Sequence, residues 1–188
     1  NKNRNLVDLE YLDLIHRDEF MDWFQENAEE IDFVYHLGAR TDTAEFSKEI
    51  FDELNLNYSK KVFDLCTAYK IPLVYASSAA TYGNGDHGYN DEADISDLKP
   101  LNPYGDSKQD FDLWVAKQKQ TPPFFAGVKF FNVYGPGEWH KSRMASVIFH
   151  AYNQIKATNK MKLFMSHRKD FKNGEQKRDF IYVKDLVD

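Results

Sequence analysis

Residues 71–83 read Ile-Pro-Leu-Val-Tyr-Ala-Ser-Ser-Ala-Ala-Thr-Tyr-Gly, a short apolar run that passes directly into small and polar residues. Short apolar runs of this length and composition are typical of buried strands. Small residues after such a strand let backbone N–H groups approach a ligand closely. Residues 71–83 therefore predict a strand of a parallel sheet with a ligand-binding loop at its carboxyl end.

Further strands and helices are expected on both sides of this stretch. The strands are predicted over residues 32–36, 71–75, 127–131 and 180–183. The helices are predicted over residues 45–69, 104–118 and 144–156. Alternating strands and helices indicate an α/β fold, in which helices cover the faces of a parallel sheet. No internal repeat or linker interrupts residues 1–188, so we expect one continuous unit.

The composition is that of a folded, acidic protein. The chain has 188 residues, of which 42% are hydrophobic and 15% aromatic, which excludes the profile of a disordered protein. Its net charge of −6 argues against sequence-independent binding to nucleic acid or to an anionic membrane. No run approaches the roughly 20 apolar residues of a membrane span.

Cysteine and histidine usage narrows the classes of site. Cys66 is the only cysteine, so an intrachain disulfide is excluded and a reducing, cytoplasmic setting is expected. The six histidines show no paired ligand spacing, and we expect no metal site. His36 ends an apolar strand and is interpreted as a hydrogen-bonded interior residue.

Tyr104 and Lys108 are four residues apart at the start of a predicted helix, so both side chains point off one face. An ammonium beside a phenol stabilises the phenolate, and a strand-end hydroxyl such as Ser78 can bond the same substrate oxygen. The spacing alone is weak, because a chain with 11 tyrosines contains about one such pair by chance. A second copy, Tyr152 and Lys156, is interpreted as a helix surface pair.

Four motifs in order then carry a resemblance to a known family. They are residues 77–83 (SSAATYG), 102–108 (NPYGDSK), 131–136 (FNVYGP) and 178–183 (RDFIYV). Together they resemble the extended short-chain dehydrogenases/reductases, the NAD-dependent epimerase/dehydratase family. The resemblance runs from about Lys2 to Asp188 and implies a Rossmann-like, doubly wound parallel sheet. It also implies a dinucleotide cofactor, a nucleotide-sugar substrate and a homo-oligomer.

The resemblance implies roles for particular residues. The catalytic set would be Tyr104, Lys108, Ser78 and, as a second acid/base, Lys141. The cofactor would lie against Lys2, Arg17, Leu37, Gly38, Ala39, Arg40, Thr41, Asn55, Tyr104, Lys108, Val133 and Lys141. The substrate would lie against Ser78, Asn132, Arg143, His150, Phe164, Met165, Ser166, His167 and Arg178. The alternatives are a solvated loop lysine for Lys141 and a surface ion pair for Arg178.

Residues 137–147, followed by His150, most resemble the members that epimerise C6 of ADP-heptose for lipopolysaccharide. Lys2 and Arg17 match positions at the adenosine end of the cofactor, where cations favour NADP over NAD. The alternatives are a 4-epimerase, a 4,6-dehydratase and a non-catalytic nucleotide-binding relative. A dehydratase needs an Asp-Glu pair where this chain has Ala79-Ala80, which counts against that alternative.

The resemblance also sets expectations about the ends of the chain. The Gly-rich fingerprint that cradles the cofactor pyrophosphate is expected before residue 1, and the substrate lobe, which begins within about residues 132–178, is expected to continue past Asp188. Residues 1–188 would then be a partial NADP-binding Rossmann domain. We expect these residues alone to bind the cofactor weakly or not at all.

Overall fold

The computed structural model describes residues 2–42, 45–167, 169 and 171–188. They form two compact units: the sheet unit, residues 12–130, and the strand-pair unit, residues 1–11 together with 131–188. The division falls next to Asn132, where the resemblance starts the substrate lobe.

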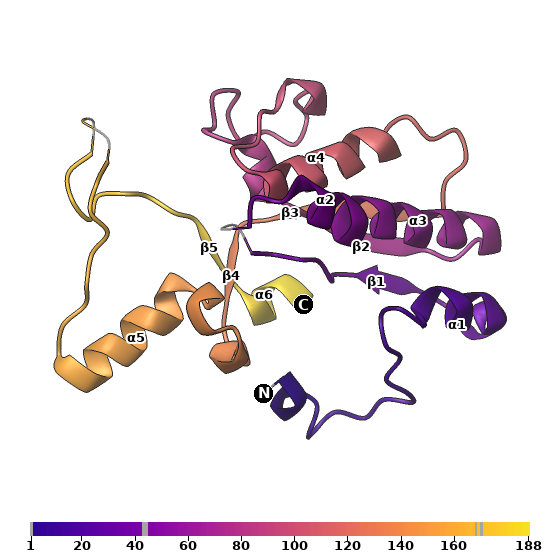
Figure 1. Cartoon of the computed structure of the whole chain (residues 1–188), viewed down its shortest axis with the longest axis horizontal. Coiled ribbons are helices and arrows are strands. Elements are labelled where there is room, and N and C mark those ends of the chain that lie inside the picture. Colours follow the sequence, from indigo (N-terminus) through magenta and orange to yellow (C-terminus); the bar gives the residue numbers. More distant parts are fainter. Residues whose placement is uncertain (1, 43–44, 168, 170) are drawn as a thin grey trace. The chain divides into compact units, whose positions relative to one another are not determined.

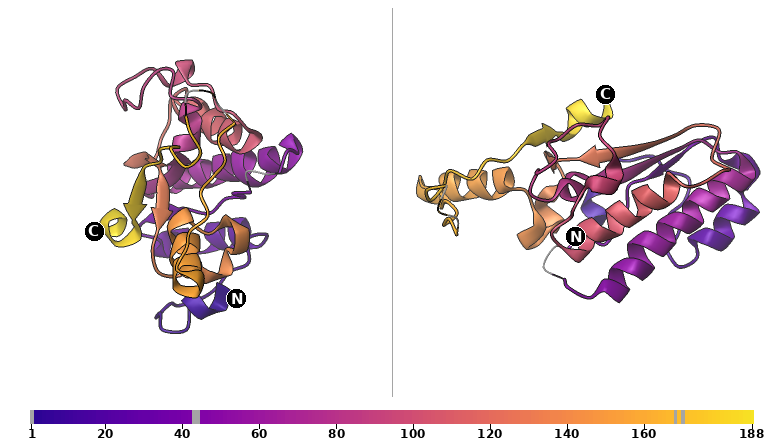
Figure 2. Two further views of the ribbon diagram at one scale, coloured as in Figure 1. Left: turned by 90° about the vertical axis from the view of Figure 1, so that its left-hand side faces the viewer. Right: turned by 90° about the horizontal axis from the view of Figure 1, so that it is seen from above.

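The sheet unit contains three parallel strands in the order β1-β2-β3. The strands are β1 (Val34–His36), β2 (Leu73–Ser78) and β3 (Phe125–Phe130). Its helical segments are α1 (Phe20–Glu26), η2 (Ala28–Glu30), α2 (Lys48–Phe51), the π-helical η3 (Asp52–Asn57), α3 (Tyr58–Tyr69), η4 (Ala79–Tyr82), η5 (Ile95–Asp97) and α4 (Pro103–Val115). Figures 1 and 2 show α3 and α4 side by side along one face of this sheet. The predicted α/β fold with a parallel sheet is confirmed.

Aromatic side chains make the core between the helices and the sheet. Phe63 of α3 packs edge-on against Phe111 and Trp114 of α4, and Phe111 packs against Tyr75 of β2. Phe24 of α1 is fully buried in the same cluster. Because this core ties α4 to β2, the start of α4 is held near the carboxyl end of β2.

The strand-pair unit contains β4 (Asn132–Tyr134) and β5 (Phe180–Tyr182), which pair in parallel. Its helical segments are η1 (Lys2–Asn5), η6 (Glu138–His140), η7 (Ser142–Met144), α5 (Val147–Thr158) and α6 (Val183–Val187). No strand was predicted over residues 132–134, because β4 is paired by a strand almost 50 residues later in the chain. Nothing in its local pattern reveals that partner.

Helix boundaries differ from the predicted ones for identifiable reasons. Residues 45–69 begin their helix only at Lys48, after Ser47, and contain a π-helical stretch. Helix α4 begins at Pro103 because the Asn102 side chain accepts a hydrogen bond from the Gly105 N–H at 2.8 Å. That cap puts Tyr104 in the first turn.

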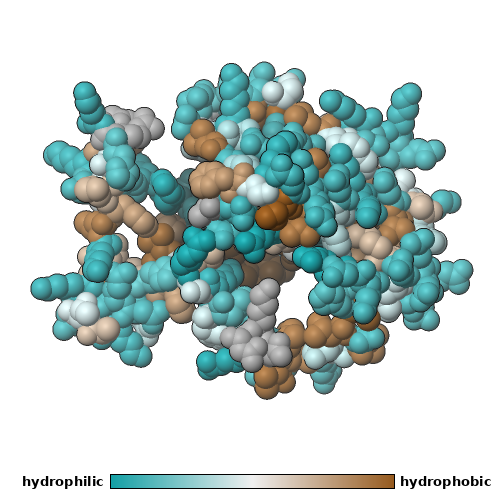
Figure 3. Space-filling view, viewed as in Figure 1, coloured by the Kyte–Doolittle hydropathy of each residue, from teal (hydrophilic) through white to brown (hydrophobic). Residues whose placement is uncertain are grey.

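Hydrophilic residues cover most of the face drawn in Figure 3, as the 29% charged residues lead one to expect. Within the part of the chain that the structure describes, no helix combines the length and apolarity that a bilayer crossing requires.

Candidate active site

The Ser78 hydroxyl and the Tyr104 phenol meet where β2 ends and α4 begins. The Ser78 hydroxyl lies close enough to the phenol to lower its pKa, and the Ser78 Oγ accepts a hydrogen bond from the Ala80 N–H at 3.1 Å. Burial raises the pKa of Tyr104 above its usual value, and the effect of Ser78 offsets only part of that rise. The structure thus brings together the phenol and the hydroxyl that the sequence pattern paired.

Lys108 lies one turn further along α4 and is 4% exposed. Its Nζ donates to the Ala76 carbonyl of β2 at 2.7 Å. Burial lowers the pKa of Lys108 to about 8, although the Asp112 carboxylate favours the charged form. The sequence argument has Lys108 lowering the pKa of Tyr104, but here the lowering influence on that pKa is Ser78. The ammonium is directed at a backbone carbonyl instead.

A buried polar network lies behind this cluster and was not anticipated from the sequence. The Asp112 carboxylate accepts from the Tyr75 hydroxyl at 3.2 Å, the Ser77 hydroxyl at 2.6 Å and the Lys129 ammonium at 2.6 Å. Lys129 also donates to Thr81 at 2.9 Å. Asp112 follows Lys108 by four residues on α4, so the helical spacing that paired Tyr104 with Lys108 could have found it.

The loop after β1, residues 37–41, lies where parallel strands collect ligands. A Cβ added to Gly38 would meet nothing within 4 Å, so the backbone there is open. Asn55 holds the loop: its Oδ1 accepts from the Arg40 N–H at 2.8 Å, and its Nδ2 donates to the Arg40 carbonyl and to Ser107. Asn55 is 2% exposed, so the structure gives it a loop-fixing role, and its direct cofactor contact stays a prediction.

His36 precedes this loop and is hydrogen-bonded, as its position predicts. Its Nε2 lies 2.8 Å from the Ser59 hydroxyl. Burial, and to a lesser extent the Lys108 charge, lowers the pKa of His36 to about 4. Cys66 is also buried, and burial raises the pKa of its thiol to about 12.

Arg17 and Lys2 are the two cations that the resemblance places against the adenosine end of the cofactor. Arg17 is half-exposed, pairs with Asp18 at 3.1 Å and lines a depression of about 620 Å³ with Tyr58 and Lys61. The side chain of Lys2 lies outside the described part of the structure. In the described ranges, no group of three His, Cys, Asp or Glu side chains is placed to hold a metal ion.

In the strand-pair unit, Lys141 and Arg143 lie on the loop between β4 and α5, and both are exposed. Val133 is within β4, and the half-buried His150 is on α5. Trp139, on the same loop, packs under the Arg4 guanidinium at 4.7 Å. As expected, Tyr152 and Lys156 form a surface pair on α5, with Tyr152 63% exposed.

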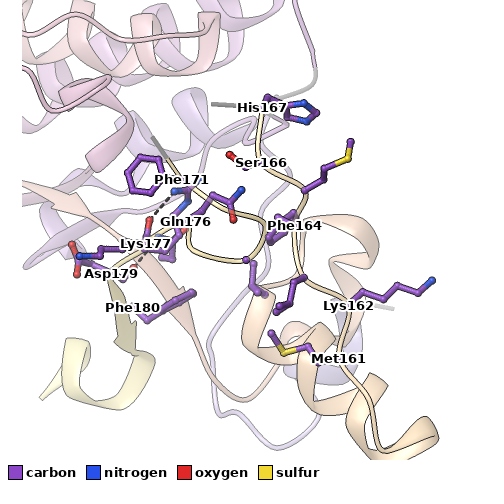
Figure 4. Close-up of a pocket in the computed structure, with 16 residues that line it drawn as sticks. Met161, Lys162, Phe164, Ser166, His167, Phe171, Gln176, Lys177, Asp179 and Phe180 are labelled. Carbon is purple, nitrogen blue, oxygen red and sulfur yellow. Dashed lines mark hydrogen bonds between the residues drawn. The ribbon is translucent and has the colours of Figure 1, made fainter. Parts of the chain in front are cut away.

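One pocket of the strand-pair unit, of about 850 Å³, gathers six predicted substrate residues (Figure 4). They are Asn132, Phe164, Met165, Ser166, His167 and Arg178. Phe171 and Phe180 add aromatic surface, and Lys162 and Lys177 add positive charge. Aromatic faces and cations are the groups that stack a base and neutralise phosphates. His150 and Arg143 are not among the residues that line this pocket.

Comparisons with known proteins agree with this architecture. The chain matches the NAD dependent epimerase/dehydratase family over residues 1–188. It is 48% identical to the ADP-L-glycero-D-manno-heptose-6-epimerase of Fusobacterium nucleatum subsp. nucleatum, covering 98% of this chain and 57% of that protein. It is 46% identical to the protein of the same name from Nitratidesulfovibrio vulgaris, covering 100% of this chain and 58% of that protein.

A solved structure shows the same likeness in three dimensions. The crystal structure of Helicobacter pylori ADP-L-glycero-D-manno-heptose-6-epimerase matches with a TM-score of 0.79 at 26% identity, over 98% of this chain and 56% of that one. The chain thus spans a little more than half the length of the relatives it matches. With the family match covering all 188 residues, the chain belongs to the NAD dependent epimerase/dehydratase family.

Proposed function

We propose that the protein of which this chain forms part epimerises C6 of ADP-glycero-manno-heptose, interconverting the D-glycero and L-glycero forms. The observation that carries the proposal is that the Ser78 hydroxyl and the Tyr104 phenol lie together, with Lys108 one turn further along α4. A module that only binds nucleotide has no use for a phenol and a buried ammonium placed one turn apart on a helix. The names of the relatives supply the substrate class.

The residues around this pair fit a nicotinamide dinucleotide. The open backbone at Gly38 admits close approach, and Asn55 fixes the loop that carries it. The hydroxyl of Tyr104 and the ammonium of Lys108 are the donor types that bind ribose hydroxyls. When bound, the nicotinamide accepts a hydride from C6 and returns it. NADP rather than NAD is proposed, because Lys2 and Arg17 are cations that suit a 2′-phosphate.

Within this proposal Tyr104 takes the proton of the C6 hydroxyl in one epimer, while Ser78 holds the same oxygen. Burial raises the pKa of the phenol, so another group has to stabilise the phenolate. A cation close to the phenol favours the phenolate. Lys108 supplies a positive charge while its Nζ is protonated, at pH values below its pKa of about 8.

Epimerisation needs an acid/base group on each face of C6, since the hydroxyl points to opposite sides in the two epimers. We assign Tyr104 to one epimer and Lys141 to the other. Lys141 suits that role because its backbone is fixed within a tight loop, while its side chain is exposed. Arg143 and His150 are proposed to contact the substrate.

The pocket between residues 161 and 180 is proposed to hold the nucleotide diphosphate of the substrate. Arg178 is exposed there, and its guanidinium can bind a diphosphate with two parallel hydrogen bonds. Phe164 and Phe180 offer faces for the adenine. We further propose a cytoplasmic homo-oligomer that supplies heptose for lipopolysaccharide.

Two substitutions in the full-length protein test the function. Tyr104→Phe and Lys141→Ala should each lower the rate of ADP-heptose epimerisation by about a hundredfold or more. A mass spectrum of the ligand released from the purified protein should show NADP. Near-normal turnover in the Lys141 variant, or activity confined to another nucleotide sugar, would reject the heptose assignment.

A further inference from the structure

Glu138 lies on the loop that carries Lys141, defined here as the Lys141 loop, residues 135–146. Its carboxylate accepts from the Gly135 N–H at 3.0 Å, from the Ser146 N–H at 2.6 Å and from the Ser146 hydroxyl at 2.9 Å. Gly135 and Ser146 are the two ends of the loop. One side chain therefore ties both ends together from inside.

This carboxylate is buried, since Glu138 is only 5% exposed. Burial by itself would raise the pKa of Glu138, but the hydrogen bonds from Ser146 and Gly135 and the charge of Lys141 outweigh it and lower the pKa. Glu138 is therefore an anion at neutral pH. A buried anion is tolerated only where donors satisfy it, so the three donors and the carboxylate fix one another.

The interior of the loop is built on the backbone of the same residue. The Lys141 N–H donates to the Glu138 carbonyl at 2.9 Å, and the Met144 N–H donates to the Lys141 carbonyl at 2.9 Å. Three residues of the loop have positive φ, namely Gly135 at +148°, Gly137 at +93° and Ser142 at +50°. A left-handed serine is an unfavourable conformation, which persists only when its surroundings impose it.

The N-terminal segment contacts the same loop from outside. The Asn5 Nδ2 donates to the Gly137 carbonyl at 3.0 Å and lies 3.3 Å from the His140 Nδ1. These contacts leave the Lys141 side chain exposed. The loop thus combines a fixed backbone with an accessible amine.

We propose that Glu138 is a positioning residue that holds the Lys141 amine in place for proton transfer at C6. The inference rests on the proposed function, because it acts through Lys141 and not through the substrate. Loss of the carboxylate releases both ends of the loop and lets Lys141 move. A displacement of about 1 Å at a reacting group can cost about a hundredfold in rate.

The test is Glu138→Gln in the full-length protein with bound cofactor. The amide keeps the size of the side chain but turns one acceptor into a donor that faces the Ser146 N–H. Each epimer of ADP-heptose is mixed separately with the enzyme, and the rise of reduced-nicotinamide absorbance is followed in a single turnover. In that step the C6–H bond breaks, the hydride reduces the cofactor, and the hydroxyl proton passes to Tyr104 or Lys141.

We expect Glu138→Gln to slow this oxidation at least about tenfold with the epimer that Lys141 serves, and less than about twofold with the epimer that Tyr104 serves. Lys141→Ala should show the same preference for one epimer. Glu29→Gln, an exposed glutamate of η2, is the matched control and should change neither rate. A merely structural role of Glu138 would slow both epimers alike.

The outcomes separate this inference from the proposed function. If Lys141→Ala distinguishes the epimers and Glu138→Gln slows both equally or neither, only the positioning role is overturned. If Lys141→Ala does not distinguish them, the proposed role of Lys141 is rejected, and the positioning role with it. Should Glu138→Gln fail to fold, Glu138→Asp, which keeps the charge on a shorter stem, should show the same epimer preference with a smaller loss.

Discussion

Lys108 occupies a position where its charge is sensitive to pH. Burial lowers its pKa to about 8, because an ammonium loses solvation inside the protein. The charge is present below that pH and is lost as the pH rises through it. In the proposed mechanism, Lys108 therefore carries the positive charge that favours a phenolate only in the lower pH range.

Because the Lys108 charge is lost at high pH, we predict that the pH profile of the full-length enzyme has an alkaline limb, on which the activity falls. The value of kcat/KM should fall as the pH rises above about 8. Lys108→Met should lower kcat/KM by about a hundredfold or more at neutral pH and remove that limb, because the titrating group is gone. A pH profile of both proteins measures this. A variant that keeps the limb would show that another group produces it.

His36 makes a prediction about stability rather than activity. Its pKa is about 4 in the folded chain against an ordinary value of 6.5, so the unfolded state binds more protons between those pH values. Stability that is complete above about pH 6.5 should therefore decline as the pH falls toward 4. The difference amounts to at most roughly 3 kcal/mol.

Thermal unfolding of the chain and of His36→Gln across that pH range measures this contribution. The natural chain should lose Tm more steeply than the variant as the pH falls from 6.5 to 4, since glutamine does not titrate. Parallel curves for the two proteins would show that protonation of His36 does not oppose folding.

At the scale of elements, the strand that ends at Ser78 and the helix that begins before Tyr104 could be predicted, because both follow from local signals. An apolar run gives β2, and Pro103 after Asn102 gives the start of α4. The strand β4 could not be predicted, because its pairing with β5 joins segments far apart in the chain. Local sequence patterns determine where a strand or helix forms, but the strand with which it pairs depends on residues far away in the chain.

Buried polar networks were missed for a related reason. Asp112 follows Tyr104 and Lys108 at helical spacing, but Lys129 comes from β3, and only the fold brings the two to 2.6 Å. Asn55 is a residue that the sequence did single out, since the resemblance implies that it binds the cofactor. In the structure its amide is hydrogen-bonded to the Arg40 backbone and to Ser107. A sequence match fixes the residue type but not the contacts of its side chain.

The pair of Asp112 and Lys129 gives a prediction at this scale, since it ties α4 to β3. Lys129→Met should lower the free energy of unfolding by about 3 kcal/mol, because it leaves the Asp112 carboxylate buried with fewer donors. Replacing both, with Asp112→Asn and Lys129→Met, should recover most of that loss. Urea unfolding measures the three proteins. A double variant as unstable as Lys129→Met would show that the uncompensated charge is not the cause.

At the scale of the whole molecule, the two units differ in how much they bury. The described core residues lie almost entirely in the sheet unit, around Phe63, Leu73 and Phe111. In the described part of the strand-pair unit, the buried residues are Glu138 and Ala145. Segments with few buried contacts open locally at lower free energy than a packed core does.

Hydrogen exchange should therefore separate the units. We predict that the amides of β2, α3 and α4 exchange at least about a hundredfold more slowly than those of α5 and β5, as measured by mass spectrometry of peptides from the intact chain.

Because Phe164, Met165 and Arg178 line one pocket, adding ADP-heptose to the full-length protein should slow exchange in residues 161–180 if the nucleotide diphosphate binds there. The slower exchange should disappear in Arg178→Ala, which keeps the pocket but removes the cation. Equal exchange rates in residues 161–180 with and without ADP-heptose would show that the diphosphate does not bind in this pocket. That result would not bear on the role of Tyr104.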